Sequence, residues 1–275
     1  MKKVSALILA LTMCTAMLTA CGGGNSTTTS STGSAAPAPT TSAATSEAGA
    51  DEGYKLATDG TLTMATNAYF PPYEYYDGQD VIGIDADIAQ AIADKLGLKL
   101  KIEDMEFDSI ITAVSTGKAD LGLAGMTVTP DRQKNVDFSD TYANGVQVII
   151  VKEDSTIAKP DDLKGKKIGV QLSTTGDLTA TDKFGKDSVV QYNKGNDAVM
   201  ALTQGQIDAV IIDNEPAKSY VAANKGLKIL DTEFLNEDYA ACISKDNAGL
   251  TKAVNKALAE LKADGTLQKI SVELL

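Results

Sequence analysis

The most informative ionisable residue in this 275-residue chain is an arginine. Arg132 is the only arginine, and every other positive side chain is a lysine. A planar guanidinium can hold a carboxylate through two parallel hydrogen bonds, which the ammonium group of lysine cannot match. Arg132 is therefore a candidate ligand clamp, although a surface ion pair with Asp131 or Asp137 fits its chemistry equally well.

The residues beside Arg132 also favour an anion. Thr129-Pro130 has the pattern of a helix N-cap followed by the first helical residue, which would place Arg132 beside unpaired backbone N–H groups. Upstream, residues 119–125 (ADLGLAG) predict a short buried strand that leads into Gly125 and Thr127. We therefore expect a hydroxyl, backbone donors and a guanidinium at one place.

Strand and helix patterns alternate in the chain that surrounds this stretch. The predicted elements are strand 61–65, helix 84–96, strand 98–102 and helix 108–116. Strands that alternate with helices predict an α/β sheet with helices packed on it.

A second stretch repeats the pattern that precedes Gly125. Residues 113–125 (AVSTGKADLGLAG) and 201–213 (ALTQGQIDAVIID) share alanine, glycine and aspartate at identical offsets. The repeat predicts two similar α/β lobes, with chance as the alternative because helix–glycine–strand connections are common. Gly125 and Asp213 would then lie at equivalent strand ends, where open α/β sheets bind ligands. A cation on one lobe and a carboxylate on the other suit the two ends of an α-amino acid.

Two apolar stretches indicate where the lobes join. Residues 146–151 (VQVIIV) and 239–243 (YAACI) are each predicted to be one continuous strand of a two-stranded hinge. Lobe I would comprise 54–146 and 240–275, and lobe II 147–239.

The N-terminal part has the features of export and tethering. Residues 1–20 have two lysines followed by an apolar core, which predicts a signal peptide. Leu18-Thr19-Ala20-Cys21 resembles the bacterial lipoprotein processing box, in which Cys21 is lipidated; ordinary cleavage after Ala20 is the alternative. The remainder of 21–53 is small and polar, as in a flexible linker. We expect a protein attached by lipid to the extracytoplasmic face of the cell membrane.

Composition excludes several other classes of function. The formal net charge is −12, and −14 once the two leader lysines are removed, which disfavours nucleic acid and anionic lipid as partners. The chain has no histidine, so serine–histidine and cysteine–histidine catalysis and common zinc sites are excluded. Cys242 would remain alone after processing, without a disulfide partner. We expect a monomer that uses no metal or cofactor.

Seven ordered motifs give the chain a resemblance to the polar amino-acid-binding lipoproteins of ABC importers, the bacterial solute-binding protein family 3. The motifs are YFPPYE at 69–74, GIDADI at 83–88, FD at 107–108, GKAD at 117–120, TVTPDR at 127–132, DFSD at 137–140 and DDLKGK at 161–166. The resemblance implies a two-lobed periplasmic-binding-protein-like α/β fold with a two-stranded hinge and a ligand cleft between the lobes.

The same resemblance implies the ligand contacts. The implied site consists of Asn67, Phe70, Phe107, Gly125, Met126, Thr127, Arg132, Gln171, Thr175 and Asp213. Arg132 and Thr175 would hold the α-carboxylate, and Asp213 would hold the α-ammonium. Thr127 and Gly125 would hold the bound amino acid from the first lobe. The two phenylalanines would form side-chain walls, with Asn67 and the glutamine as polar selectors.

Other polar residues near these motifs have simpler interpretations. Many family members have glycine where this chain has Ser173, which makes the local backbone path a departure from the pattern. Asp85 and Asp87 are interpreted as acidic residues stabilised by a helix N-terminus, and the acidic run 104–108 as solvated.

The resulting hypothesis is capture of an α-amino acid by closure of the cleft and delivery to the permease and ATPase subunits of an ABC importer. One alternative is a dehydratase of prephenate-like acids on the same scaffold, and another is a tethered amino-acid sensor. The absence of histidine, and of a second carboxylate among the predicted cleft residues, argues against an enzyme.

Overall fold

The computed structural model describes residues 53–274 of the chain. The predicted signal peptide 1–20, the lipidation site Cys21 and all but the last residue of the linker 21–53 lie outside the described residues. Within the part that is described, no helix has both the length and the apolar character needed to cross a membrane.

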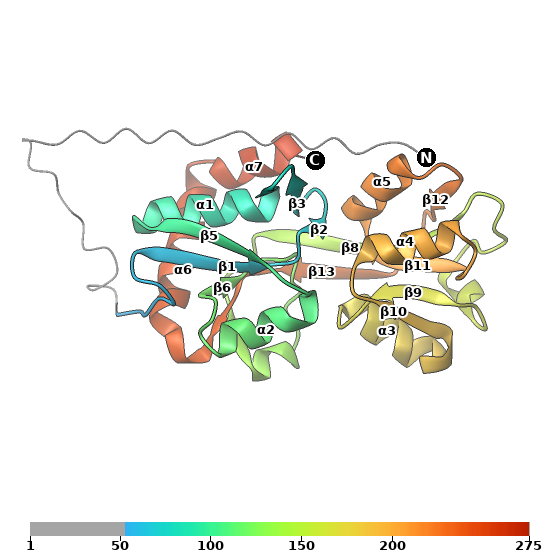
Figure 1. The fold of residues 1–275 in the computed structure, drawn as a ribbon, viewed down its shortest axis with the longest axis horizontal. Coiled ribbons are helices and arrows are strands. Elements are labelled where there is room, and N and C mark those ends of the chain that lie inside the picture. The colour runs from blue at the N-terminus through green and yellow to red at the C-terminus, as the bar shows by residue number, and fades with distance from the viewer. Residues whose placement is uncertain (1–52, 275) are drawn as a thin grey trace, which may run out of the picture. The chain divides into compact units, whose positions relative to one another are not determined.

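The first main sheet has five strands in the order β5-β1-β6-β14-β7 (Figure 1). Its strands are β1 (Thr61–Thr66), β5 (Lys99–Asp104), β6 (Leu121–Gly122), β7 (Val136–Phe138) and β14 (Cys242–Ser244). Its helices are α1 (Ile84–Leu96), α2 (Phe107–Ser115), α6 (Ala248–Ala263) and α7 (Thr266–Leu274). β1 runs parallel to β5 and β6, whereas β14 is antiparallel to β6 and β7. We call this sheet with its helices lobe I.

Sequence patterns account well for the core of lobe I. Every residue of β1 after Thr61 is buried, as expected for a parallel strand covered on both faces. Helix α1 has the predicted bounds, and it buries Ile88 and Ile92, which lie one turn apart on one face. It ends at Gly97, whose φ of 67° is the left-handed conformation that glycine adopts without strain.

The second main sheet has six strands in the order β10-β9-β11-β8-β12, with β13 also paired to β8. Its strands are β8 (Ala143–Lys152), β9 (Ile168–Gln171), β10 (Val189–Tyr192), β11 (Ala209–Asp213), β12 (Leu227–Ile229) and β13 (Leu235–Tyr239). Helices α3 (Thr175–Phe184), α4 (Gly195–Thr203) and α5 (Asn214–Ala223) pack on this sheet. We call it lobe II.

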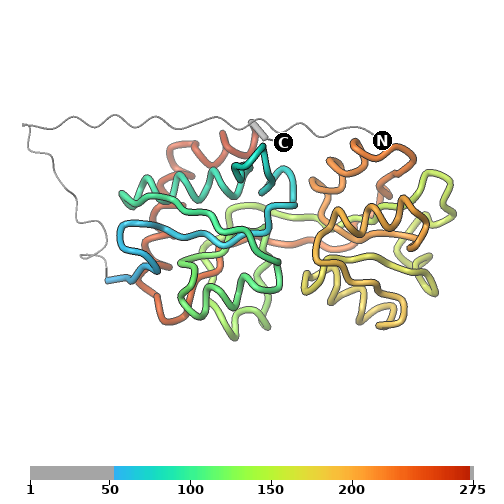
Figure 2. The backbone as a smooth tube through the Cα atoms, in the orientation of Figure 1, coloured from blue at the N-terminus to red at the C-terminus, as the bar shows by residue number. Residues whose placement is uncertain are grey.

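The lobes are joined by two antiparallel strands, β8 and β13 (Figure 2). β8 is one long strand, as predicted, but the prediction of one continuous strand over 239–243 is wrong. That stretch divides into β13 and β14, with Ala240 and Ala241 between them. Their N–H groups donate to Met126 O at 3.1 Å and to Ser139 Oγ at 2.9 Å, so loop atoms interrupt the strand pairing where the chain enters lobe I.

A small third sheet and four short 3-10 helices complete the described fold. The sheet has the order β2-β3-β4, with β2 (Tyr69–Phe70), β3 (Glu74–Asp77) and β4 (Asp80–Ile82). The 3-10 helices are η1 (Arg132–Lys134), η2 (Pro160–Leu163), η3 (Lys186–Ser188) and η4 (Lys245–Asn247). The small sheet matters for the site, because β2 and β3 carry Phe70 and Glu74 to its wall.

Candidate functional site

One cavity between the lobes is lined by nine of the ten predicted site residues. These nine are Asn67, Phe70, Phe107, Gly125, Thr127, Arg132, Gln171, Thr175 and Asp213. Met126 is the exception, because its side chain is fully buried in a cluster with Ala65 and Ile110. The cavity volume is about 20 Å³, which suffices for about one water molecule, so entry of a larger ligand requires the lobes to separate.

Arg132 lines this cavity and contacts both lobes. Its guanidinium donates to Thr127 O at 2.8 Å in lobe I and to Ser173 O at 3.1 Å in lobe II. The guanidinium carbon is 5.3 Å from the centroid of the Phe107 ring, within cation–π range. Burial lowers the pKa of Arg132 and the Glu237 carboxylate opposes that shift, but a guanidinium keeps its charge in such a setting.

Arg132 is not part of a surface ion pair with its acidic neighbours. Asp131 is paired with Lys134 at 2.5 Å, and Asp137 lies 3.6 Å from Lys245. Arg132 itself is only 8 % exposed. The interpretation of this arginine as an ordinary surface partner of Asp131 or Asp137 therefore does not hold.

The predicted helix start at Thr129-Pro130 is wrong in both extent and consequence. Only the three-residue helix η1 forms, because the chain turns at Asn135 and enters β7 directly afterwards. Thr129 does act as a local cap, since its Oγ1 accepts the Arg132 N–H at 3.2 Å. That N–H is consequently not available to an anion, and the guanidinium is the group that Arg132 offers to a ligand.

Asp213 supplies the opposite charge from lobe II. It ends β11 at the start of α5, is 8 % exposed and accepts a hydrogen bond from the Tyr239 hydroxyl. Burial and the nearby Glu237 carboxylate raise the pKa of Asp213 to about 8. A cationic group placed beside Asp213 would lower that pKa and ionise the carboxyl.

Gly125 brings the backbone of lobe I into the cavity. Its φ of 52° is left-handed, and a Cβ there would come within 2.8 Å of the Phe70 ring, so glycine is required. Its N–H donates to Asp85 Oδ2 at 2.8 Å. The interpretation of Asp85 as only a helix N-terminal residue is therefore incomplete, because Asp85 is fully buried and holds the cavity loop.

The start of α3 provides the second-lobe donors. Thr174 caps the helix by accepting the Asp177 N–H at 3.2 Å, while Thr175 Oγ1 accepts from Gln147 Nε2 at 3.0 Å. Ser173 has φ of 64° and is the only non-glycine residue with positive φ in the described chain. This conformation explains why glycine would suit the position, and it aims the Ser173 carbonyl at Arg132.

Two amide side chains meet at another wall of the cavity. Gln171 Nε2 donates to Asn67 Oδ1 at 2.9 Å, which joins lobe II to lobe I, and also to Asn193 O at 3.1 Å. Asn67 Nδ2 donates to Met105 O at 2.8 Å. Each selector amide predicted from the sequence is thus held in place by a hydrogen-bonded partner.

Several lining residues were not anticipated from the sequence. They are Glu74, Ala124, Gln147, Thr174, Ile211, Ile212 and Glu237. The predicted set of cleft residues contained one carboxylate, Asp213, whereas Glu74 and Glu237 are also buried in this cavity. For Glu237 a signal was present: it lies two residues before Tyr239, and alternate residues of β13 face inward.

In residues 53–274 no group of three or more histidine, cysteine, aspartate or glutamate side chains is arranged to hold an ion. Cys242 is fully buried in the core of lobe I, where burial raises the pKa of its thiol to about 12 and keeps it neutral.

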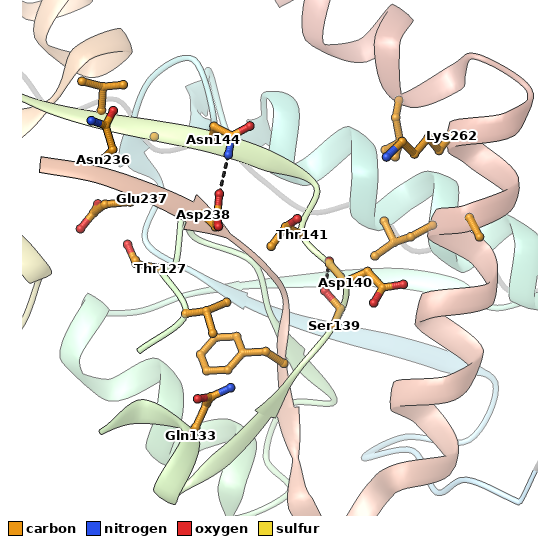
Figure 3. Close-up of a pocket in the computed structure, with 17 residues that line it drawn as sticks. Thr127, Gln133, Ser139, Asp140, Thr141, Asn144, Asn236, Glu237, Asp238 and Lys262 are labelled. Carbon is orange, nitrogen blue, oxygen red and sulfur yellow. Dashed lines mark hydrogen bonds between the residues drawn. The ribbon is translucent and has the colours of Figure 1, made fainter. Parts of the chain in front are cut away.

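A second and larger cavity, about 1110 Å³, opens beside the hinge strands (Figure 3). Here Asn144 Nδ2 of β8 donates to Asp238 Oδ1 of β13 at 2.5 Å. Arg132 and Asp213 do not line this cavity, so it lacks the pair of opposite charges that marks the smaller one. Glu237 lines both, because β13 forms the wall between them.

Comparisons with known proteins agree with this arrangement. The family model of bacterial extracellular solute-binding proteins, family 3, matches residues 62–273. The arginine-binding extracellular protein ArtP of Bacillus subtilis (strain 168) is 36 % identical over 236 residues, which cover 82 % of this chain and 88 % of that protein.

Two solved structures are also similar. An ancestral arginine-binding protein bound to glutamine is 41 % identical, with a TM-score of 0.76, and the match covers 79 % of this chain and 99 % of that one. The substrate binding protein of an amino acid ABC transporter is 40 % identical, with a TM-score of 0.73 and coverage of 78 % and 99 %. The predicted two-lobed fold is thereby confirmed.

Proposed function

Because the chain belongs to the bacterial extracellular solute-binding proteins of family 3, we propose that it captures an α-amino acid in the cavity between its lobes and presents it to an ABC importer. The observation that carries this proposal is the placement of Arg132 and Asp213, from different lobes, in the same buried cavity. Nothing in the family or its named relatives points to catalysis, and the dehydratase alternative is not favoured.

The charges assign an orientation to the bound amino acid. Arg132 pairs with the α-carboxylate, aided by the hydroxyls of Thr127 and Thr175. Asp213 pairs with the α-ammonium, and the Gly125 carbonyl can accept a second hydrogen bond from that group. The Gly125 N–H is not available to the ligand, because it is already bonded to Asp85. The side chain then lies against Phe70 and Phe107, with Asn67 and Gln171 as its polar neighbours.

The balance of charge in the cavity restricts the class of side chain. One guanidinium faces the carboxyl groups of Glu74, Asp213 and Glu237. A ligand with an anionic side chain would add a further negative charge and is disfavoured. Arginine and glutamine, which similar proteins bind, satisfy this condition as cationic and neutral polar amino acids. We therefore place the ligand in one of these two classes.

Closure follows from where the charged groups lie. In an open protein Arg132 and Asp213 are apart and solvated, and a zwitterion can pair with both only when the lobes meet. Ligand therefore favours the closed state, which an importer permease can distinguish from the open one. We assign residues 54–146 and 240–275 to one lobe and 147–239 to the other.

The protein acts outside the cytoplasm, as its family does. We propose that residues 1–20 are removed, that Cys21 is lipidated and holds the chain to the membrane, that residues 21–53 form the linker, and that the protein acts as a monomer. Mass spectrometry of the mature N-terminus tests the anchor: a diacylglyceryl adduct on Cys21 is expected, and an unmodified cysteine would contradict it.

A binding screen tests the function. The purified protein should be heated with each of the twenty amino acids, because a ligand that binds only the folded state raises its melting temperature. Positive ligands should then be titrated by calorimetry, where one site per chain is expected. If no amino acid shifts the melting temperature, the proposed function is wrong; if only aspartate and glutamate do, the assigned side-chain class is wrong.

A further inference from the structure

A pair of buried carboxyl groups lies behind the wall of the cavity. Glu74, on β3, is 1 % exposed and lines the cavity. Asp85, on α1, is fully buried, and its backbone N–H donates at 2.8 Å to the carbonyl of Tyr73, the residue before Glu74. Glu74 Oε2 and Asp85 Oδ1 are both inaccessible to solvent, and neither receives a hydrogen bond from an N–H or O–H group of the described residues.

The charges around Glu74 make its ionised form costly. The charged groups with the largest effect on it are Asp85 on α1, Asp213 on β11 and Asp104 on β5, and all three are acidic. Arg132 and Glu237 also line the cavity that Glu74 lines. The other titratable neighbours are the phenols of Tyr73, Tyr142 and Tyr220, whose pKa values burial raises, so they stay neutral. Two ionised carboxylates in a dry site with no cation between them would repel each other.

One proton shared by Glu74 and Asp85 would both remove the charge repulsion and give the two unpartnered oxygens a hydrogen bond. A protonated Glu74 has an O–H group that can donate to Asp85, and this bond would give a partner to the two buried oxygens that otherwise lack one. Burial and the neighbouring Asp85 hold the pKa of Glu74 well above its usual range, while burial raises the pKa of Asp85 to about 6 against the hydrogen bonds that it accepts. The two groups titrate as a coupled pair in which Glu74 keeps the proton.

The other oxygen of Asp85 connects this pair to the ligand cavity. Asp85 Oδ2 accepts the Gly125 N–H and the Tyr142 O–H, each at 2.8 Å. Gly125 lines the cavity in a left-handed conformation, at a position where an added Cβ would come within 2.8 Å of the Phe70 ring. The orientation of the Asp85 carboxylate therefore determines where the Gly125 backbone lies.

We infer that Glu74 is a neutral carboxylic acid in the native protein at physiological pH, that it donates its proton to Asp85, and that Asp85 so held is the positioning residue for Gly125 in the ligand cavity. The assignment of Glu74 and Asp85 does not depend on the function proposed above, whereas its effect on ligand affinity does.

The variant Glu74→Gln tests the proton directly, because an amide keeps a donor for Asp85 but cannot ionise. The native wild type retains a proton that the unfolded chain releases above the usual pKa of glutamate, so its stability should fall as pH rises from about 5 to 8. Glu74→Gln should lose this component, and its melting temperature should rise relative to wild type by several degrees over that range. Exposed Glu153→Gln is the matched control and should follow the wild type.

Parallel pH profiles for wild type and Glu74→Gln would overturn the inference. Infrared spectra provide a second readout that needs no ligand. At pH 7 the difference spectrum between wild type and Glu74→Gln should contain the carbonyl stretch of one protonated carboxylic acid, because protonated Asp213 contributes equally to both proteins. A difference spectrum without that band would refute a neutral Glu74.

The positioning role is tested at Gly125. Asp85→Ala should accelerate hydrogen exchange of the Gly125 amide at least tenfold, whereas Glu74→Gln and the control Asp87→Ala, an exposed acid of the same helix turn, should not. With L-arginine and L-glutamine as probes, Asp85→Ala should weaken binding more than tenfold and the control Asp87→Ala less than threefold. Unchanged Gly125 exchange in Asp85→Ala would overturn the positioning role; wild-type protein that binds no amino acid would overturn the proposed function alone.

Discussion

The segments 113–125 and 201–213 have the same order of helix, glycine, aspartate and strand. The first leads to the cationic Arg132, whereas the second ends at the acidic Asp213. In each, a helix is followed by a left-handed glycine, Gly117 with φ of 73° and Gly205 with φ of 75°. Each then has an aspartate that accepts a backbone N–H, from Thr63 within β1 for Asp120 and from Lys167 just before β9 for Asp208. Each continues into a strand with one parallel and one antiparallel partner. The sequence repeat therefore reflects a structural repeat.

Strand length is where the two copies differ. β6 pairs over two residues with the short strand β14, so the chain leaves the sheet early and reaches Gly125 as a loop. β11 pairs along five residues of the long hinge strand β8 and keeps Asp213 in the sheet until α5 begins. One edge thus presents backbone groups and leads on to Arg132, whereas the other presents a fixed carboxylate. The two segments thus place groups of opposite charge at equivalent strand ends, because strand pairing ends earlier in β6 than in β11.

The largest expected effect comes from removing either charge. Arg132→Ala and Asp213→Ala should each weaken amino-acid binding at least 100-fold, because each leaves one end of the zwitterion buried and unpaired. Calorimetry measures the affinity, and circular dichroism checks that the fold remains. Arg132→Lys, which keeps the charge but not the planar fork, should fall between wild type and alanine. Near-normal affinity in either alanine variant would contradict the claim that the two lobes hold opposite ends of the ligand.

The second effect is a pH dependence of ligand affinity that comes from Asp213 of lobe II. In the closed state that the structure describes, Asp213 has a pKa of about 8 and is mainly protonated at pH 6 to 7, whereas pairing with an ammonium group requires its ionised form. If the ligand-free protein rests in this closed state, affinity should increase by about tenfold per pH unit up to about pH 8 and then level off. Calorimetry at pH 7 in buffers of different ionisation enthalpy should detect the release of about one proton. An affinity that is flat from pH 6 to 8 would contradict this assignment.

A smaller effect should separate the two structural aspartates. Asp120 is 5 % exposed and accepts the N–H groups of Ala57 and Thr63, both at 2.7 Å, whereas exposed Asp208 accepts only that of Lys167, at 2.8 Å. Asp120→Ala should reduce the free energy of unfolding by about 2–3 kcal/mol, and Asp208→Ala by about 0.5–1 kcal/mol. Urea unfolding measures both. Equal losses would mean that the copies are stabilised alike.

The smallest effect concerns the left-handed residue that faces Arg132 from lobe II. Ser173→Gly relieves a serine at φ of 64°, and the gain should be about 0.5 kcal/mol after the added freedom of the unfolded chain is counted. Ligand affinity should stay within about twofold, since the carbonyl that Arg132 contacts is unchanged. Thermal unfolding compares the two proteins, and a loss of stability in Ser173→Gly would show that the serine hydroxyl has a role of its own.

Much of the fold was predictable because it depends on local patterns. Helix α1 was predicted at its observed bounds, since its apolar residues recur at helical spacing and Gly97 ends it. Nine cavity residues were identified through motifs that surround the strand ends. Their roles toward a ligand remain predictions, which the variants above test.

The remaining features depend on contacts between residues distant in sequence. Glu237 and Gln147 face the cavity because β13 pairs with β8, and the register of that pairing is not visible in either segment alone. Glu74 meets Asp85 only after the small third sheet packs against α1. The Thr129-Pro130 pattern indicated a helix, but β7 begins too soon for one to grow. In each case the tertiary partner decided the outcome.

The uniqueness of Arg132 has a practical consequence. A dicarbonyl reagent that is selective for guanidinium groups can modify this protein at one position only. Because that side chain is 8 % exposed between the lobes, the rate of its modification reports how often the lobes part. The chain thus carries its own chemical probe of cleft opening, which can be read by mass spectrometry without any engineered label.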